Sequence, residues 1–278
     1  MRYLLYLIVG FSTCIYGDAQ TVSSDGELLA KARALYDAPF TRNLVSFDCA
    51  VHFDWKNHFV DFLTTVPPKV VPIVERLQTI QHRVVVTRSA ANVSDIPKTI
   101  DLSGVAHAAE LEQGLESIIS AGLNAWLPAS TNVILPAEPT RYSFQKINPG
   151  YKLDMNGAGF AATLLLTADM HVTSGISQLP EPNRFATEFV PGPDGLLLGL
   201  LKSGSDKNGE AAFAFTYQRV QGFQLPSLIT VTSSTNETWR YALTDCKAMT
   251  GVTIKVGLPV SNPAPAPSPS LDGILIPQ

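Results

Sequence analysis

Residues 45–54 read VSFDCAVHFD, and this stretch carries the clearest strand signal in the chain. Every second residue from Val45 to Phe53 is apolar, counting Cys49 as a small hydrophobic residue, and the residues between them are polar or small. Because successive side chains of a β-strand point to opposite faces, this alternation predicts a strand with one buried and one exposed face. We expect similar segments farther along the chain to join it in a sheet.

The second half of the chain contains a series of such segments, separated by turn signals. The separators include Asn-Pro-Gly at 148–150, Pro-Gly-Pro-Asp-Gly at 191–195 and the polar loop 203–209. Short alternating runs between turns of this kind predict consecutive hairpins, about eight to ten antiparallel strands in all. The expected strands are 142–147, 151–155, 161–177 in one or two pieces, 184–190, 196–202, 212–221, 227–233 and 238–246; an earlier one is expected at 84–87.

Helical patterns are concentrated in the first half. Ser24 and Glu27 have the spacing of a capping box, and apolar residues after them recur at helical period, which predicts a helix from about 25 to 36. The strongest helical stripe runs from about 105 to 126, and Pro128 is expected to end it. Weaker patterns predict helices at 54–63 and 67–77, and 92–104 resembles a loop. The fold class is therefore predicted to be α+β.

The first residues have the features of a cleavable export signal. Arg2 precedes the apolar run 3–11, which is too short to span a bilayer, and the small residues Gly17 and Ala19 follow. Cleavage is expected before Gln20, so that the protein is exported to the periplasm or the extracellular space. An alternative is a lipoprotein signal in which Cys14 becomes the lipidated first residue.

The remaining chain is predicted to form one α+β domain, 20–260, and a tail. Residues 261–278 begin with alternating prolines and contain no core-forming stretch at that point, so an extended C-terminal tail is expected. Hydrophobic residues make up 45% of the 278 residues and charged residues 16%, which fits a globular domain with a real core. No later window predicts a transmembrane helix. The net charge is −4, and the Lys and Arg residues are scattered, so no basic patch predicts nucleic-acid binding.

Two cysteines remain after the predicted signal is removed. An even pair in an exported protein predicts a disulfide, here between Cys49 in the first strand and Cys246 in the last. This bond would require the two strands to lie close together and would close a loop of almost the whole domain. The alternative is two separate buried thiols.

No stretch of the chain carries a recognisable catalytic, nucleotide-binding or cofactor motif, and none is assigned. Polar residues on and after the first strand could converge on a metal ion, but the solvent face of a strand produces the same pattern, and no metal is expected. These residues are Asp48, His52, Asp54 and His58. The other histidines, His82, His107 and His171, are expected to be ordinary core or surface residues.

Part of the C-terminal half of the sequence resembles a known family. Val220–Ser227 (VQGFQLPS), a Thr-rich strand and the segment Trp239–Cys246 are similar to the corresponding part of periplasmic lipoprotein-sorting proteins of the LolA/LolB type. The likeness covers roughly residues 25–249, although the helical stretch 67–129 is longer than the family pattern. It implies a large curved antiparallel sheet, a half-barrel-like meander with several helices on one face, whose apolar concave side holds acyl chains.

The first functional hypothesis is a non-enzymatic binder or carrier of a lipid or acyl ligand. Aromatic residues at alternating strand positions are the candidate walls of its concavity, although an ordinary filled core has the same pattern. These residues are Phe213, Phe215, Tyr217, Trp239 and Tyr241. The alternatives are an envelope structural or interaction protein whose Pro-rich tail reaches a partner protein, and a hydrolase with an unrecognised site.

Overall fold

The computed structural model describes residues 24–54, 82–94, 108–132, 134–135, 141–157, 160–178, 182–205, 207 and 209–251. This part of the chain contains two α-helices, α1 (Asp25–Ala34) and α5 (Ala108–Ser130), and a 3-10 helix, η1 (Pro39–Thr41). The strands are β1 (Leu44–Phe53), β2 (His82–Thr87), β3 (Ala91–Ser94), β4 (Arg141–Lys146), β5 (Gly150–Gly157), β6 (Phe160–Thr167), β7 (Val172–Gln178), β8 (Pro182–Gly192), β9 (Gly195–Ser205), β10 (Gly209–Val220), β11 (Phe223–Thr232) and β12 (Thr238–Thr250).

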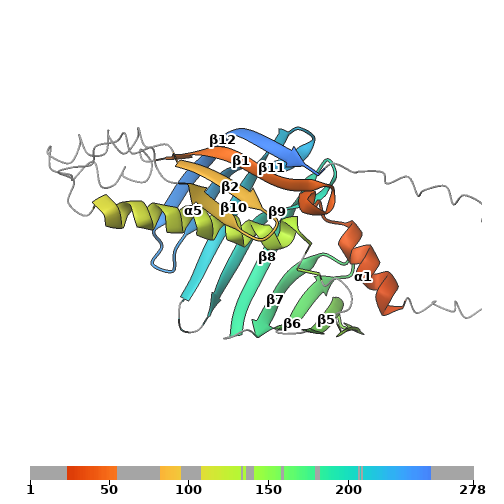
Figure 1. Cartoon of the computed structure of the whole chain (residues 1–278). Helices are drawn as coiled ribbons and strands as arrows, with labels where there is room; N and C mark the ends of the chain where they lie inside the picture. The colour runs from red at the N-terminus through yellow and green to blue at the C-terminus, as the bar shows by residue number, and fades with distance from the viewer. Residues whose placement is uncertain are drawn as a thin grey trace, which may run out of the picture.

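All twelve strands form one sheet in the order β3-β2-β1-β12-β11-β10-β9-β8-β7-β6-β5-β4. Every pairing is antiparallel, and from β4 to β12 each strand pairs with its successor in the chain. The sheet is not closed, because β3 and β4 are edge strands. It is strongly twisted, so that β1 and β12 run across the direction of β5 to β8 (Figure 1). The predicted antiparallel sheet and its meander are confirmed.

The helices confirm the fold prediction only in part. Helix α1 begins with the predicted capping box, in which the Glu27 amide donates to Ser24 Oγ and the Ser24 amide donates to the Glu27 carboxylate. It lies beside edge strand β4, whose Phe144 amide donates to the Asp25 carboxylate. Several helices on one face are not confirmed, because the weaker predicted helices fall almost entirely outside the described residues. The export signal, Cys14 and the tail 261–278 also lie outside them.

Two local expectations differ from the structure. Residues 91–94 form strand β3 instead of a loop, because they pair with β2. Helix α5 continues past Pro128 to Ser130, since a proline removes only one main-chain donor, and the Thr131 amide still donates to the Leu127 carbonyl. The segment 161–177, predicted in one or two pieces, forms the two strands β6 and β7, which a turn at Met170 with a left-handed φ of 70° separates.

Helix α5 contributes to a core cluster that joins distant strands. Ile119, Leu123 and Trp126 are buried there with side chains of β1, β2 and β9 to β12. The Trp126 ring meets Phe47 edge-on at a centroid distance of 5.8 Å. A second cluster joins α1 to β5, β6 and β7. The C-terminal half of α5 therefore lies over the sheet near the boundary between the two clusters.

The predicted disulfide between Cys49 and Cys246 is present. Strand β1 pairs with β12, and the two Cα atoms are 4.2 Å apart. The bond therefore joins the first strand of the chain to the last, across one of the inner pairings of the sheet.

The segment after α1 contacts strands β7, β8 and β9. Main-chain hydrogen bonds join Leu35 and Asp37 to Leu196 at the start of β9. The Tyr36 hydroxyl accepts a hydrogen bond from the Val172 amide at 2.7 Å, and its ring packs edge-on against Phe189 at 4.7 Å. These contacts fix the relative positions of the strands that form the candidate site.

Candidate functional site: a pocket between α5 and strands β5 to β9

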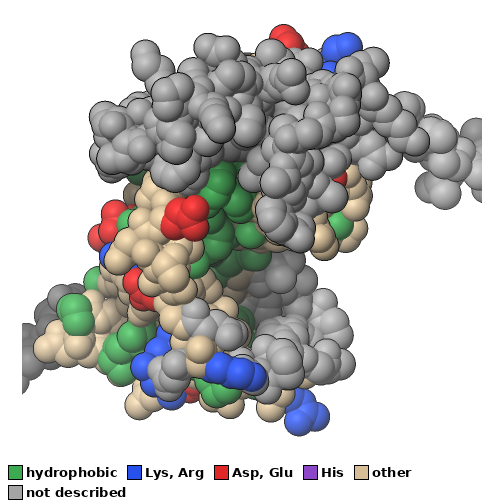
Figure 2. Space-filling model, turned by 90° about the vertical axis from the view of Figure 1, so that its left-hand side faces the viewer, with side chains coloured by type: hydrophobic (Ala, Val, Ile, Leu, Met, Phe, Trp, Pro, Cys, Tyr) green, Lys and Arg blue, Asp and Glu red, His purple; other side chains and the backbone are tan. Residues whose placement is uncertain are grey.

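An apolar pocket of about 370 Å³ lies between the end of α5 and the sheet; we call it the α5 pocket. Its lining, as far as the structure describes it, consists mainly of hydrophobic side chains and contains no charged residue. The residues are Ala125, Pro128 and Ile134 from α5 and the turn after it, and Met155, Ala162, Leu164, Ser177, Asn183, Phe185, Thr187, Leu198, Leu201 and Ser203 from β5 to β9. In the space-filling view, hydrophobic side chains gather in a hollow on one side of the molecule (Figure 2).

The strand residues face the pocket because of the sheet register. Met155, Ala162, Ser177 and Asn183 are successive partners across β5, β6, β7 and β8, so they form one row on the same face. The next row on this face includes Leu164, Gly175, Phe185 and Ser203. Residues that are distant in the sequence are thereby brought to one surface.

A glycine on β7 makes room for the aromatic wall of the pocket. A Cβ atom at Gly175 would lie 2.6 Å from the Phe185 ring and 2.7 Å from a Leu164 methyl group. Its absence lets both side chains lie over the β7 backbone. Phe185 and Leu164 therefore meet above β7 and form a continuous apolar surface.

Four hydroxyl- or amide-bearing side chains interrupt the apolar lining. The Thr187 hydroxyl is buried and donates to the Val172 carbonyl at 2.9 Å, so its proton is already used within the protein. Asn183 Nδ2 donates to Ser203 Oγ at 3.0 Å, and the Ser203 hydroxyl donates back to Asn183 Oδ1 at 3.3 Å. The Ser177 hydroxyl has no hydrogen-bond partner within the described part of the chain.

The five aromatic residues predicted to line a concavity lie in or next to the core cluster of α5. Phe215 and Tyr241 are buried in it, Phe213 and Tyr217 pack against it, and Trp239 meets Phe53 edge-on at 6.3 Å. None of the five is among the lining residues of the α5 pocket. Phe213 pairs in register with Leu201, and Leu201 does line the pocket. Their contact with a ligand stays a prediction.

Two of these aromatic residues hold the framework together through their hydroxyl groups. Tyr217 donates to the Leu198 carbonyl at 2.7 Å, and Tyr241 donates to the Ile119 carbonyl of α5 at 3.0 Å. Burial raises the pKa of both phenols well above the ordinary value. They therefore remain protonated donors at physiological pH and act as structural ties.

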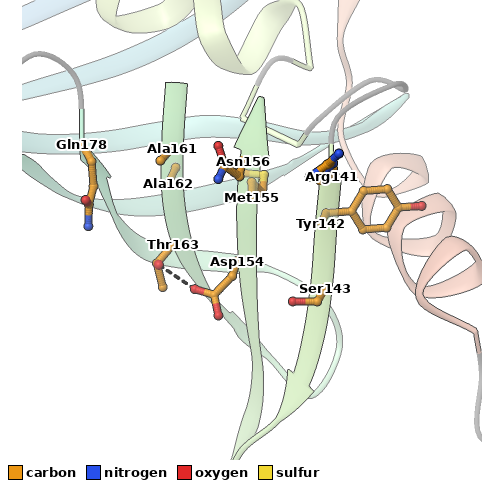
Figure 3. Close-up of a pocket in the computed structure, with 10 residues that line it drawn as sticks. All are labelled: Arg141, Tyr142, Ser143, Asp154, Met155, Asn156, Ala161, Ala162, Thr163 and Gln178. Atoms are coloured by element: carbon orange, nitrogen blue, oxygen red, sulfur yellow. Dashed lines mark hydrogen bonds between the residues drawn. The ribbon is translucent and has the colours of Figure 1, made fainter. Parts of the chain in front are cut away.

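A second hollow, of about 380 Å³, lies at the ends of β4 to β7 (Figure 3). Its polar side chains include Asp154, which accepts from the Thr163 hydroxyl at 2.7 Å and pairs with Lys152 at 2.8 Å. The hydrogen bonds from Lys152 and Thr163 hold the pKa of this carboxyl below its ordinary value. By strand alternation, Asp154 and Thr163 face away from the α5 pocket. Asp154 is therefore held in this hollow as a paired, hydrogen-bonded carboxylate.

Two of the polar residues considered for metal binding or catalysis, Asp48 and His82, have partners in the sheet. Asp48 pairs with Arg83 at 2.8 Å, and burial lowers the pKa of His82, whose ring packs against Phe53. Among the described residues, no group of three or more His, Cys, Asp or Glu side chains could hold a metal ion. His58 and His107 lie outside the described residues.

Comparisons of the chain with protein-family models, with curated proteins and with solved structures gave no match. The similarity to the LolA/LolB type therefore stays a prediction, and the α5 pocket must be interpreted from its own geometry. No helix in the described ranges has both the length and the apolar character needed to cross a membrane.

Proposed function

We propose that this protein is an exported, non-enzymatic binder or carrier of a lipid or acyl ligand, which it holds in the α5 pocket. The observation that carries the proposal is an apolar pocket with a small number of polar groups, the usual composition of a small-molecule site. Its volume of about 370 Å³ is within the typical range.

The size of the pocket favours a single acyl chain. At about 30 Å³ for each heavy atom, the share of a water molecule in the liquid, 370 Å³ holds about twelve carbon atoms. Burial of each methylene group from water contributes about 0.8 kcal/mol. A chain of this length therefore gains enough from burial to bind without any charged contact.

The disulfide supports the exported part of the proposal. Such bonds form and persist in the periplasm and outside the cell, and they are rare in the cytosol. The bond between Cys49 and Cys246 is buried at the Cys49 end and links two strands of the folded sheet. It agrees with the export signal that the first nineteen residues predict.

A bulky side chain inside the α5 pocket should weaken ligand binding. Ser177→Phe places a ring among Ala162, Asn183 and Phe185, and we expect the affinity for the neutral fluorescent probe N-phenyl-1-naphthylamine to fall by about tenfold or more, equivalent to about 1.4 kcal/mol. Fluorescence titration of the purified protein measures this change. Mass spectrometry of protein purified from its own host should also detect a co-purified lipid.

The matched control is Ser174→Phe, the same substitution on the same strand. Residue 174 is three positions from Ser177, so alternation places it on the opposite face, where it pairs with Leu165 and Ala186. This variant should bind the probe as the unmodified protein does. Absence of saturable binding by the unmodified protein, or equal binding by Ser177→Phe, would contradict the proposed function.

A further inference from the structure

The polar side chains of the α5 pocket are not spread evenly over its wall. Ser177 and Asn183 are direct partners in the β7–β8 register, and Asn183 is hydrogen-bonded to Ser203 on β9. We call Ser177, Asn183 and Ser203 the polar triad. The remaining strand residues of the lining are apolar, apart from Thr187, whose hydroxyl proton is held by the Val172 carbonyl. Among the described lining residues, the side-chain hydrogen-bonding groups open to a ligand therefore lie together on β7 to β9.

Within the described part of the chain, the polar triad has donors that are not used in a hydrogen bond. Asn183 has two amide protons, and one of them is directed to Ser203. The Ser177 hydroxyl has no partner among the residues that the structure describes. A carbonyl oxygen of a ligand can thus accept from Ser177 and from the second amide proton of Asn183.

The cations next to the polar triad in the sequence of β8 and β9 point away from the pocket. Arg184 lies between Asn183 and Phe185, and Lys202 lies between Leu201 and Ser203, so strand alternation directs both cations to the opposite face of the sheet. A carboxylate placed beside the polar triad would lose its hydration without gaining a cation. Such a transfer is strongly unfavourable, whereas a neutral carbonyl needs only hydrogen bonds.

We propose that the α5 pocket selects an uncharged acyl group, such as an ester or amide, over a free fatty-acid carboxylate, with the polar triad binding the acyl carbonyl. This inference rests on the proposed carrier function and specifies its ligand class. Ser177 and Asn183 are the hydrogen-bond donors, and Ser203 holds the Asn183 amide in position.

The test compares methyl laurate with laurate at pH 8, where the acid is ionised, in competition with N-phenyl-1-naphthylamine. The ester should bind at least about tenfold more tightly than laurate. The free-energy cost of burying an unpaired charge in an apolar site is larger than the free energy that one hydrogen bond contributes. Ser203→Lys should reverse this preference by supplying a cation. Ser177→Ala should weaken ester binding by about three- to tenfold, the effect of one lost hydrogen bond, and should weaken probe binding less.

Ser174→Ala, on the opposite face of β7, is the control for these variants and should leave the ratio of ester to laurate affinity unchanged. Laurate binding as tight as or tighter than ester binding would overturn the inference while leaving the carrier function standing. If neither laurate compound nor the probe binds, the carrier function itself fails. If Ser203→Lys does not fold, the ratio in the unmodified protein and in Ser177→Ala still decides the question.

Discussion

Replacing Gly122 by alanine is expected to lower the free energy of unfolding by about 2 kcal/mol, because α5 packs closely against the sheet at this residue. A Cβ atom there would lie 2.3 Å from the Tyr241 hydroxyl oxygen and 2.9 Å from a methyl group of Ile229. Either the helix or strands β11 and β12 would have to move. Chemical denaturation monitored by circular dichroism measures the loss.

The same helix supplies a control of opposite sign. No described residue has an atom within 4 Å of a Cβ atom built at Gly114, so Gly114→Ala should stabilise the protein by about 0.5–1 kcal/mol through helix propensity. Adding Tyr241→Phe to Gly122→Ala removes the nearest clashing atom and should recover part of the loss. Equal effects of the two alanine substitutions would mean that α5 does not contact the sheet as described.

Reducing the disulfide between Cys49 and Cys246 is expected to destabilise the protein by about 3–5 kcal/mol. The bond spans 197 residues, and a long closed loop restricts the unfolded chain more than a short one does. For a domain of this size, such a loss corresponds to a decrease in Tm of about 6–20 °C. Thermal melts with and without a reducing agent measure it.

A double replacement, Cys49→Ser with Cys246→Ser, provides the control for reduction. Its Tm should be low and should not change when reductant is added. Thiol labelling of the denatured, unreduced protein should find no reactive group at either position. Two labelled cysteines, or an unchanged Tm on reduction, would show that the bond does not form in the protein.

Local pattern in the sequence was sufficient for much of the sheet. The alternation in 45–53 and the turn residues between later strands predicted β1 and most hairpins, because side-chain period and turn chemistry are local properties. The proximity of Cys49 to Cys246 was predicted from export and cysteine number. Strand β3 was missed because its four residues form a strand by pairing with β2, and such pairing leaves little trace in a short segment.

The α5 pocket could not be predicted in the same way. Its lining combines one or two residues from each of several strands with the end of a helix, and no single segment shows an unusual pattern. The aromatic residues Phe213 and Phe215 gave the stronger sequence signal, but the structure packs them against the core cluster of α5. The role proposed for Ser177 and Asn183 depends on the β7–β8 register, which places the two residues side by side.

The position of β1 between β12 and β2 has a consequence for the order in which the chain is made. Synthesis begins at the N-terminus, so β1 exists long before the strand that pairs with it. In a circular permutant that begins before β4 and has the original ends joined, all twelve strands would be synthesised in the order in which they pair in the sheet. In the natural order, the sheet is interrupted beside β1 until the final strand has been synthesised. A nascent chain that stops before β12 therefore exposes two unpaired inner edges, on β1 and on β11, in addition to the edges of the finished sheet.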